Sequence, residues 1–206
     1  MNKFTLLVAA AVATSAQAQM TPVSRSSWVY AWEHTITLGH EEGFVSDERS
    51  SAGFEPINWN IGAGGYTAIQ QSAITPAAID VVARAYGTPA SALGYGSAIS
   101  TQTIVFDIGA ISTFRLEGGT ARFIGEGRMT LTGPGVDILA SVEGFQQTPF
   151  LFEGTLLAGR YTFEVYCSAD WGSVDAHLTV VPTPGTIVLC GGATTLWLVR
   201  RRRAGG

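Results

Sequence analysis

"RYTFEVYCS", residues 160–168, alternates apolar and polar side chains with a period of two. Tyr161, Phe163, Val165 and Cys167 fall on one face of an extended chain, and the side chains between them fall on the other. This pattern is typical of a half-buried antiparallel strand, because successive side chains of a strand point to opposite faces of the sheet. The stretch therefore predicts a strand with an apolar inner face.

The same alternation recurs along the chain and predicts the fold class. The apolar faces are Trp28, Tyr30, Trp32, His34, Ile36 and Leu38; Ile104, Phe106 and Ile108; Val136, Ile138, Ala140 and Val142; and Val174, Ala176, Leu178 and Val180. Glycine-containing turn signals lie between these segments, at residues 118–119, 125–127, 133–135, 144, 154, 158–159 and 172. Many short strands with frequent turns predict an all-β protein, an antiparallel β-sandwich or jelly roll.

One segment favours a helix, and the segment after it favours a loop. In "TPAAIDVVARAYG", residues 75–87, Thr75 is placed as an N-cap, Pro76 as the first helical residue, and Ile79 and Val82 at helical spacing. We therefore expect at most one short helix, over this segment. The small, glycine-rich residues 86–102 predict a loop before the next strand.

The N-terminus has the composition of a cleavable secretory signal. Lys3 precedes an apolar core that ends near Ala13, and Ala16 and Ala18 form a small-x-small cleavage site. A leader of this kind is a signal peptide and not a transmembrane span. Residues 1–18 are thus predicted to be removed by signal peptidase, and the domain that follows them to cross the cytoplasmic membrane.

The remaining composition indicates one acidic domain, predicted over residues 19–180. Between residues 19 and 182 there are seven Arg, no Lys and sixteen Asp and Glu, a formal net charge of −9 against −4 for the whole chain. This balance argues against nucleic acid, since a polyanion needs a basic surface. Cys167 and Cys190 are the only cysteines, and Cys190 lies in a terminal apolar run, so we predict no disulfide framework.

Residues 181–206 contain three parts in a fixed order. Val181, Pro182, Thr183 and Pro184 form a proline-rich stem that we predict to be an exposed, extended spacer, since proline removes backbone donors. The apolar residues 186–199 number fourteen, whereas a helix that spans a bilayer needs about 20. Four cations follow, which resist translocation and act as a stop-transfer cluster: Arg200, Arg201, Arg202 and Arg203.

This arrangement resembles the PEP-CTERM sorting signals of bacterial exported proteins. Val181, Pro182 and Pro184 match the family motif, and Thr183 stands where that motif has Glu. The resemblance implies a short transmembrane helix, processing by an exosortase near the motif, and a location at the cell surface or in the extracellular matrix. Whether the mature form is anchored or released stays open.

The candidate chemical groups do not form a recognisable catalytic or metal motif. His34, residues 40–42 and His177 lack the partners that metal or nucleophile signatures require. The carboxylates Asp107, Glu117, Glu126, Asp137 and Glu153 lie next to turns or at outward positions, which favours solvated charge. We therefore predict no catalytic residues and no metal site or cofactor, with calcium held by loop oxygens as the alternative.

The tryptophans separate the functional hypotheses. Trp28 and Trp32 fall on an apolar face and are assigned to the core, whereas Trp59 and Trp171 have polar neighbours and are the candidates for contact with a glycan. The favoured function is a structural or adhesive role at the cell surface. The alternatives are a carbohydrate-binding module for exopolysaccharide, and a surface glycan hydrolase, which would need two carboxylates across a cleft.

Overall fold

The computed structural model describes residues 20–35, 43–87, 95–142 and 147–183, and this part is all β, with no helix. Residues Gln17–Pro182 form one compact unit. No helix in the described ranges is long and apolar enough to cross a membrane. The strands are β1 (Met20–Thr35), β2 (Gly43–Ser51), β3 (Ile57–Ala63), β4 (Tyr66–Ile74), β5 (Ala78–Gly87), β6 (Tyr95–Ile108), β7 (Ser112–Gly133), β8 (Val136–Val142), β9 (Gln147–Leu156) and β10 (Gly159–Pro182).

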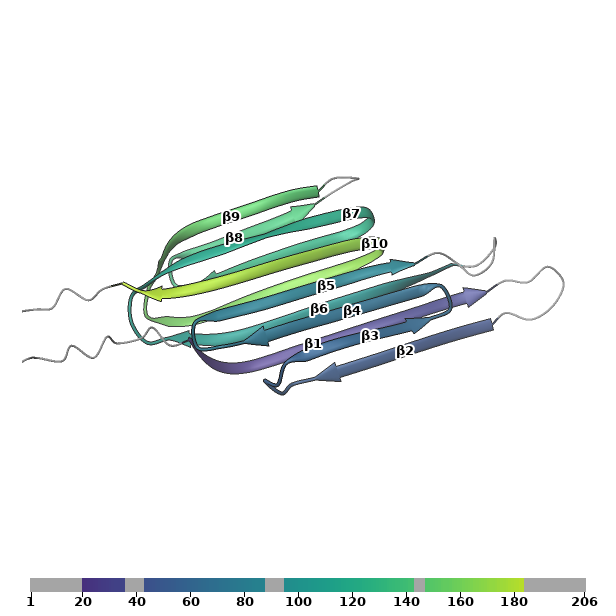
Figure 1. Ribbon diagram of the computed structural model, residues 1–206, viewed down its shortest axis with the longest axis horizontal. Coiled ribbons are helices and arrows are strands. Elements are labelled where there is room, and N and C mark those ends of the chain that lie inside the picture. The colour runs from purple at the N-terminus through teal and green to yellow at the C-terminus, as the bar shows by residue number, and fades with distance from the viewer. Residues whose placement is uncertain (1–19, 36–42, 88–94, 143–146, 184–206) are drawn as a thin grey trace, which may run out of the picture. The chain divides into compact units, whose positions relative to one another are not determined.

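The strands form two antiparallel sheets that share two long strands (Figure 1). Sheet I has the order β2, β1, β6, first half of β10, second half of β7, β8. Sheet II has the order β3, β4, β5, second half of β10, first half of β7, β9. The predicted antiparallel all-β fold is confirmed as this two-layer arrangement.

The long strands pass from one sheet to the other at a shared irregularity. The register of β10 with β7 shifts between Ala169 and Trp171 and again between Trp171 and Gly172. On β7 the same region contains Gly125, whose φ of 128° is accessible mainly to glycine. Bulges bend a strand and increase its twist, so this irregularity lets β7 and β10 continue from sheet I into sheet II.

The alternation predicted for the inner faces is confirmed on β6 and β10. Ile104, Phe106 and Ile108 are buried, as are the predicted inward residues of β10, which are Tyr161, Phe163, Val165, Cys167, Val174, Ala176, Leu178 and Val180. The rings of Phe106 and Tyr161 stack with centroids 5.7 Å apart. The hydroxyl of Tyr161 lies 2.9 Å from the carbonyl oxygen of Leu157, so this ring buries its area and still has a polar partner.

Polar side chains also join the two sheets inside the core. Gln70 of β4 donates from Nε2 to Oε1 of Gln102 on β6 at 2.7 Å. Ser100 donates to Gln70 at 2.6 Å, and Gln102 donates to Ser72 at 3.0 Å. All four residues are buried, and each bond crosses between the layers. Buried polar groups need partners, so this network specifies how the sheets face each other.

The prediction for β1 was wrong about which face lies inside. Val29 and Ala31 are fully buried, and so is Glu33, which accepts a hydrogen bond from the backbone N–H of Gly65. The aromatic residues on the opposite face, Trp28 and Trp32 among them, are only partly buried. The space between the layers under β1 takes small and polar side chains, so the large rings face outward.

Two further local predictions are corrected. The segment predicted as a helix forms β5, in which Ile79, Val81, Ala83 and Ala85 alternate inward; β-branched residues suit a pleated surface. Thr75 makes cap-like bonds to the N–H groups of Ala77 and Ala78, but they close the turn into β5. Part of the predicted loop, residues 95–102, belongs to β6, and residues 88–94 lie outside the described ranges.

Several predicted turns lie inside strands. Residues 118–119 and 125–127 belong to β7, Gly154 to β9 and Gly172 to β10, whereas residues 133–135 and 158–159 do join strands. A Cβ at Gly154 would lie 3.0 Å from the ring of Phe114. Glycine inside a strand often marks close approach of a neighbour and not a turn.

Candidate functional site

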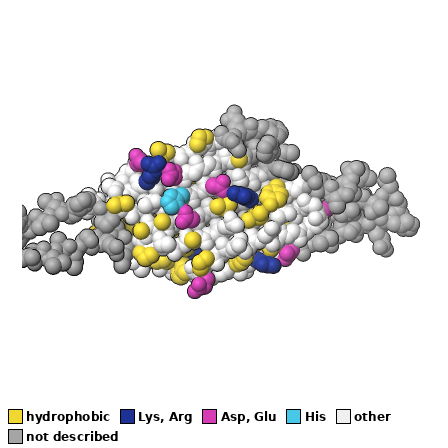
Figure 2. All heavy atoms as spheres, viewed as in Figure 1, with side chains coloured by type: hydrophobic (Ala, Val, Ile, Leu, Met, Phe, Trp, Pro, Cys, Tyr) yellow, Lys and Arg dark blue, Asp and Glu magenta, His cyan; other side chains and the backbone are white. Residues whose placement is uncertain are grey.

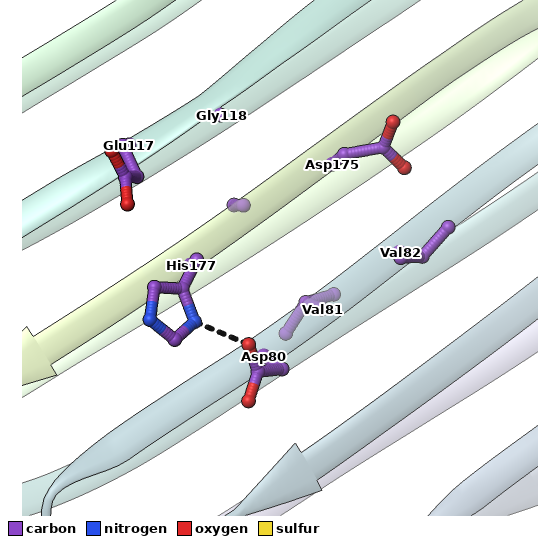
Figure 3. Close-up of a pocket in the computed structure, with 8 residues that line it drawn as sticks. Asp80, Val81, Val82, Glu117, Gly118, Asp175 and His177 are labelled. Carbon is purple, nitrogen blue, oxygen red and sulfur yellow. Dashed lines mark hydrogen bonds and ion pairs between the residues drawn. The ribbon is translucent and has the colours of Figure 1, made fainter.

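The outer face of sheet II carries a hollow of about 220 Å³ over β5, β7 and β10. Figure 3 shows its polar lining, with His177 directed toward Asp80 and Glu117 on the neighbouring strand. The register explains the grouping, because His177 pairs with Asp80 on one side and with Glu117 on the other. Three strands thus place an imidazole between two carboxylates.

A glycine holds β7 close to β10 beside this hollow. A Cβ at Gly118 would lie 1.9 Å from the backbone oxygen of Asp175 and 2.8 Å from the ring of Phe150. Any larger residue would push the strands apart. The approach fixes the position of Glu117 relative to His177.

His177 connects a carboxylate to a hydroxyl. Nδ1 bonds Oδ1 of Asp80, and Nε2 lies 2.8 Å from Oγ1 of Thr179. An ionised carboxylate only accepts, so Nδ1 carries the proton and Nε2 of the neutral ring accepts from the Thr179 hydroxyl. The order carboxylate, imidazole, hydroxyl is that of a Ser-His-Asp triad.

The surroundings of Thr179 do not complete a nucleophilic site. Thr179 pairs with Ala78 on one side and with Arg115 on the other, so its backbone belongs to the sheet ladder. An oxyanion site needs backbone or side-chain donors directed at the reacting oxygen, and the guanidinium of Arg115, the residue in register with Thr179, is bound to Glu117 and Glu153. The geometry therefore places the hydrogen-bonded chain of Asp80, His177 and Thr179, which we call the relay, on the solvent-facing side of sheet II.

The charges around the hollow are paired. Arg115 donates to Glu117 at 2.6 Å, which lowers the pKa of that carboxyl. Arg84 lies 3.6 Å from Oδ1 of Asp175. Figure 2 shows this face, where the charged side chains are few and stand mostly next to the opposite sign.

The structure does not bring the other candidate carboxylates together around a cleft. Asp107 binds Arg160 at 2.9 Å on sheet I. Glu126 lies 3.7 Å from Arg128, and Glu153 lies 3.1 Å from Arg115, while Asp137 is exposed on β8. Within the described ranges, no three side chains of the types His, Cys, Asp and Glu form a group that could hold a metal ion.

A second hollow, of about 450 Å³, lies at the open side of the sandwich between β8 and β9. Phe150 and Phe152 line it, and their rings stack at 6.1 Å. Leu139 and Leu151 at its rim are 59% and 54% exposed. The lining of this hollow is mostly apolar, includes the hydroxyl-bearing residues Thr120, Ser141 and Thr148, and contains no titratable group.

The outer face of sheet I carries a row of rings along β1. Trp28 and Tyr30 lie nearly parallel, with centroids 5.7 Å apart and planes 11° apart. Trp32 meets Tyr95 of β6 edge-on at 5.7 Å, and His34 Nδ1 lies 2.6 Å from the Tyr95 hydroxyl. We call Trp28, Tyr30, Trp32, His34 and Tyr95 the aromatic row.

The tryptophans proposed from sequence as glycan contacts lie elsewhere. Trp59 is on the edge strand β3, partly buried and packed against the core between the inward residues Ile57 and Ile61. Trp171 lies on β10 between Tyr86 and Ile124, and its side chain is outside the described residues. Sequence reasoning misses the aromatic row, because the alternation of residues 28 to 34 on β1 also fits a core face.

Cys167 is a buried free thiol on β10. Burial raises its pKa to about 12. A thiol in this state is a poor nucleophile and metal ligand, because both roles need the thiolate.

The predicted sorting stem is partly built into the fold. Val181 and Pro182 are the last residues of β10 and pair with Thr113 and Ser112 of β7, which corrects the expectation that the whole stem is an irregular spacer. Thr183 is exposed. Residues Ala16 and Ala18, Pro184 and the cluster Arg200 to Arg203 lie outside the described ranges, as do residues 40–42.

Comparison with known proteins adds no assignment. No protein-family model matches this sequence, and no curated protein matches it.

Proposed function

We propose that the chain is an exported protein that a C-terminal sorting signal delivers to the cell surface or extracellular matrix, where its sandwich has a structural or adhesive role. The proposal rests on the leader of residues 1–18 and on the motif, apolar run and arginine cluster of residues 181–203. Signal peptidase and an exosortase are the processing enzymes, and the apolar run is a transient or lasting membrane anchor.

The motif, apolar run and arginine cluster carry this proposal, and the position of the two ends of the sandwich agrees with it. The N–H of Met20, at the start of β1, donates to the carbonyl of Pro76, and the N–H of Val180, near the end of β10, donates to the carbonyl of Ala77. Both ends therefore lie beside the β4–β5 turn. A domain tethered there keeps both sheet faces and its opposite end free for contacts.

The stem geometry defines where processing leaves the fold intact. Val181 is 52% exposed, and its carbonyl accepts from Oγ1 of Thr113 at 3.3 Å. Cleavage after Pro182 preserves all pairs of β10 with β7, whereas cleavage before Val181 removes two of them. We expect the cut to fall after Pro182.

The proposed role is non-catalytic. The relay of Asp80, His177 and Thr179 orders polar groups on sheet II, and the nearby charges are neutralised in pairs. Such a surface stays soluble and resists nonspecific association.

The test is intact-mass analysis of the protein exported by its own cells. The wild type should begin at Gln19 and lack the residues after the stem, including Arg200 to Arg203. The variant Pro182→Ala/Pro184→Ala should keep them, and Thr113→Ala, which leaves the motif unchanged, should be processed like the wild type. A wild-type surface form that still carries the four arginines would refute the sorting proposal.

A further inference from the structure

We propose that the aromatic row on the outer face of sheet I binds a neutral polysaccharide chain. The proposal rests on the export argued above, because such chains lie outside the cytoplasm. The contact surface is formed by the rings of Trp28, Tyr30 and Trp32, with Tyr95 at its end. It replaces Trp59 and Trp171 as the site of glycan contact.

The rings are spaced for an extended ligand. Trp28, Tyr30 and Trp32 occupy alternate positions of β1, so neighbouring side chains start about 6.8 Å apart along the strand. The face of an aromatic ring is electronegative, and the C–H groups on one face of a sugar ring are its complement. A row of such rings contacts successive sugars of a chain.

The rings are fixed in place before any ligand arrives. The indole N–H of Trp28 donates to Oε1 of Glu48 on β2 at 2.6 Å. Tyr95 is 51% exposed and contacts both Trp32 and His34. Tryptophan and tyrosine have few rotatable bonds, so little entropy is lost when a ligand packs on them.

Hydroxyl-bearing residues surround the rings. In register with Trp28 lies Thr101 of β6, followed by Tyr166 of β10 and Arg128 of β7. The guanidinium of Arg128 lies 5.4 Å from the centroid of the Tyr166 ring. Thr103 and Ser97 occupy the same face of β6. A mixture of rings and hydrogen-bonding groups matches a sugar, which presents C–H faces and hydroxyl edges.

The charges on this face favour a neutral ligand. Arg128 binds Glu164 at 2.8 Å, and Arg160 binds Asp107 at 2.9 Å, so the cations near the row are already paired. Residues 19–182 have a net charge of −9, which repels acidic polysaccharides and nucleic acids.

The row also lies far from the tethered end. Met20 starts β1 beside the β4–β5 turn, and Trp28 follows eight residues later, about 27 Å along the strand. The aromatic row therefore lies along β1 at a distance from the two strand ends, near Met20 and Pro182, where the domain would be tethered.

The test is affinity electrophoresis of the full chain, purified in detergent, through native gels that contain dextran, laminarin or hydroxyethyl cellulose, with alginate as the acidic probe. At least one neutral polysaccharide should retard the protein, and alginate should not. Trp28→Ala and Trp32→Ala should each raise the dissociation constant obtained from the retardation about tenfold. The matched changes Trp59→Ala, at the edge of the sandwich, and His177→Ala, on sheet II, should leave it unchanged.

Tyr95→Ala distinguishes loss of binding from loss of folding, because removing this exposed ring leaves the core unchanged. It should weaken binding several-fold with an unchanged melting temperature. Retardation by none of the neutral polysaccharides would overturn the proposal, as would binding insensitive to all three ring variants. Self-association that Trp32→Ala abolishes, without glycan binding, would assign the row to a protein contact and would also overturn it. The assay does not depend on export, so failure of sorting in cells remains distinguishable.

Discussion

The two outer faces of the sandwich rest on the same kind of core but differ in chemistry. Sheet I presents aromatic rings tied to one another and separated by hydroxyl groups, as at Trp28, Thr101 and Tyr166. Sheet II presents the imidazole of His177 between the carboxylates of Asp80 and Glu117. Arginine side chains form ion pairs with carboxylates on this face, as Arg115 does with Glu117. A polar face whose charges are paired suits solvation, whereas an aromatic face suits a partner with C–H surfaces.

The largest expected effect concerns the core under both faces. Phe106→Ala removes a fully buried ring that stacks on Tyr161, and should lower the free energy of unfolding by about 3–5 kcal/mol in denaturant titrations. Leu139→Ala, at a 59% exposed position, should change it by at most about 0.5 kcal/mol. If Phe106→Ala cost no more than Leu139→Ala, the two faces would not rest on one packed core.

This core was the most predictable part of the molecule from sequence. On β10 and on the second half of β6, the inward residues at 104, 106 and 108 included, the inner face is apolar and the alternation predicts it correctly, whereas the buried Ser100 and Gln102 of β6 could not be predicted this way. On β1 both faces contain apolar residues, and ring size pointed the wrong way, because Arg25 and Glu33 are in fact buried. A local pattern cannot report how much space the opposite sheet leaves.

Long-range pairing explains the other differences. β10 was predicted as two strands divided at Gly172, since nothing local shows that both halves pair with one continuous β7. The relay of Asp80, His177 and Thr179 joins residues up to 99 positions apart, and only the register brings them together. The predicted sorting stem, in contrast, is a contiguous stretch of sequence, and its role stays a prediction.

A smaller effect is expected for the polar link between the sheets. Gln102→Ala leaves Gln70 and Ser72 buried with fewer partners and should lower the free energy of unfolding by about 1–3 kcal/mol. Gln71 makes a similar amide bond, 3.0 Å to Asn58, but on the exposed face of sheet II. Gln71→Ala should therefore have little effect in the same titration, and equal losses would contradict the role assigned to burial.

Acid should affect the ion pairs of both faces alike. Hydrogen bonds from Arg115 lower the pKa of Glu117, and those from Arg160 lower the pKa of Asp107. A carboxyl whose pKa is lower in the folded state adds stability above its unfolded pKa and loses it as the pH falls through the folded pKa. Arg115→Gln and Arg160→Gln should thus reduce the melting temperature slightly at pH 7 and less at pH 3, and a reduction independent of pH would be evidence against this pairing.

The smallest effect expected is the absence of a reaction. Cys167 is fully buried, and burial raises its thiol pKa to about 12, so a thiol reagent at pH 8 should not label it in the native protein. The measurement uses Cys190→Ala to leave one thiol, with labelling in denaturant as the positive control. Rapid native labelling would show that the layers open near the crossing of β10.

The difference between the faces can be measured directly by hydroxyl-radical footprinting of the full chain, with and without the neutral polysaccharide that retards it most. Both faces contain reactive rings, so each serves as the control for the other. We predict protection of Trp28, Tyr30, Trp32 and Tyr95, and unchanged reactivity of His177 and Tyr86. Protection centred on His177, equal protection of both faces, or no protection of the aromatic row would contradict the account.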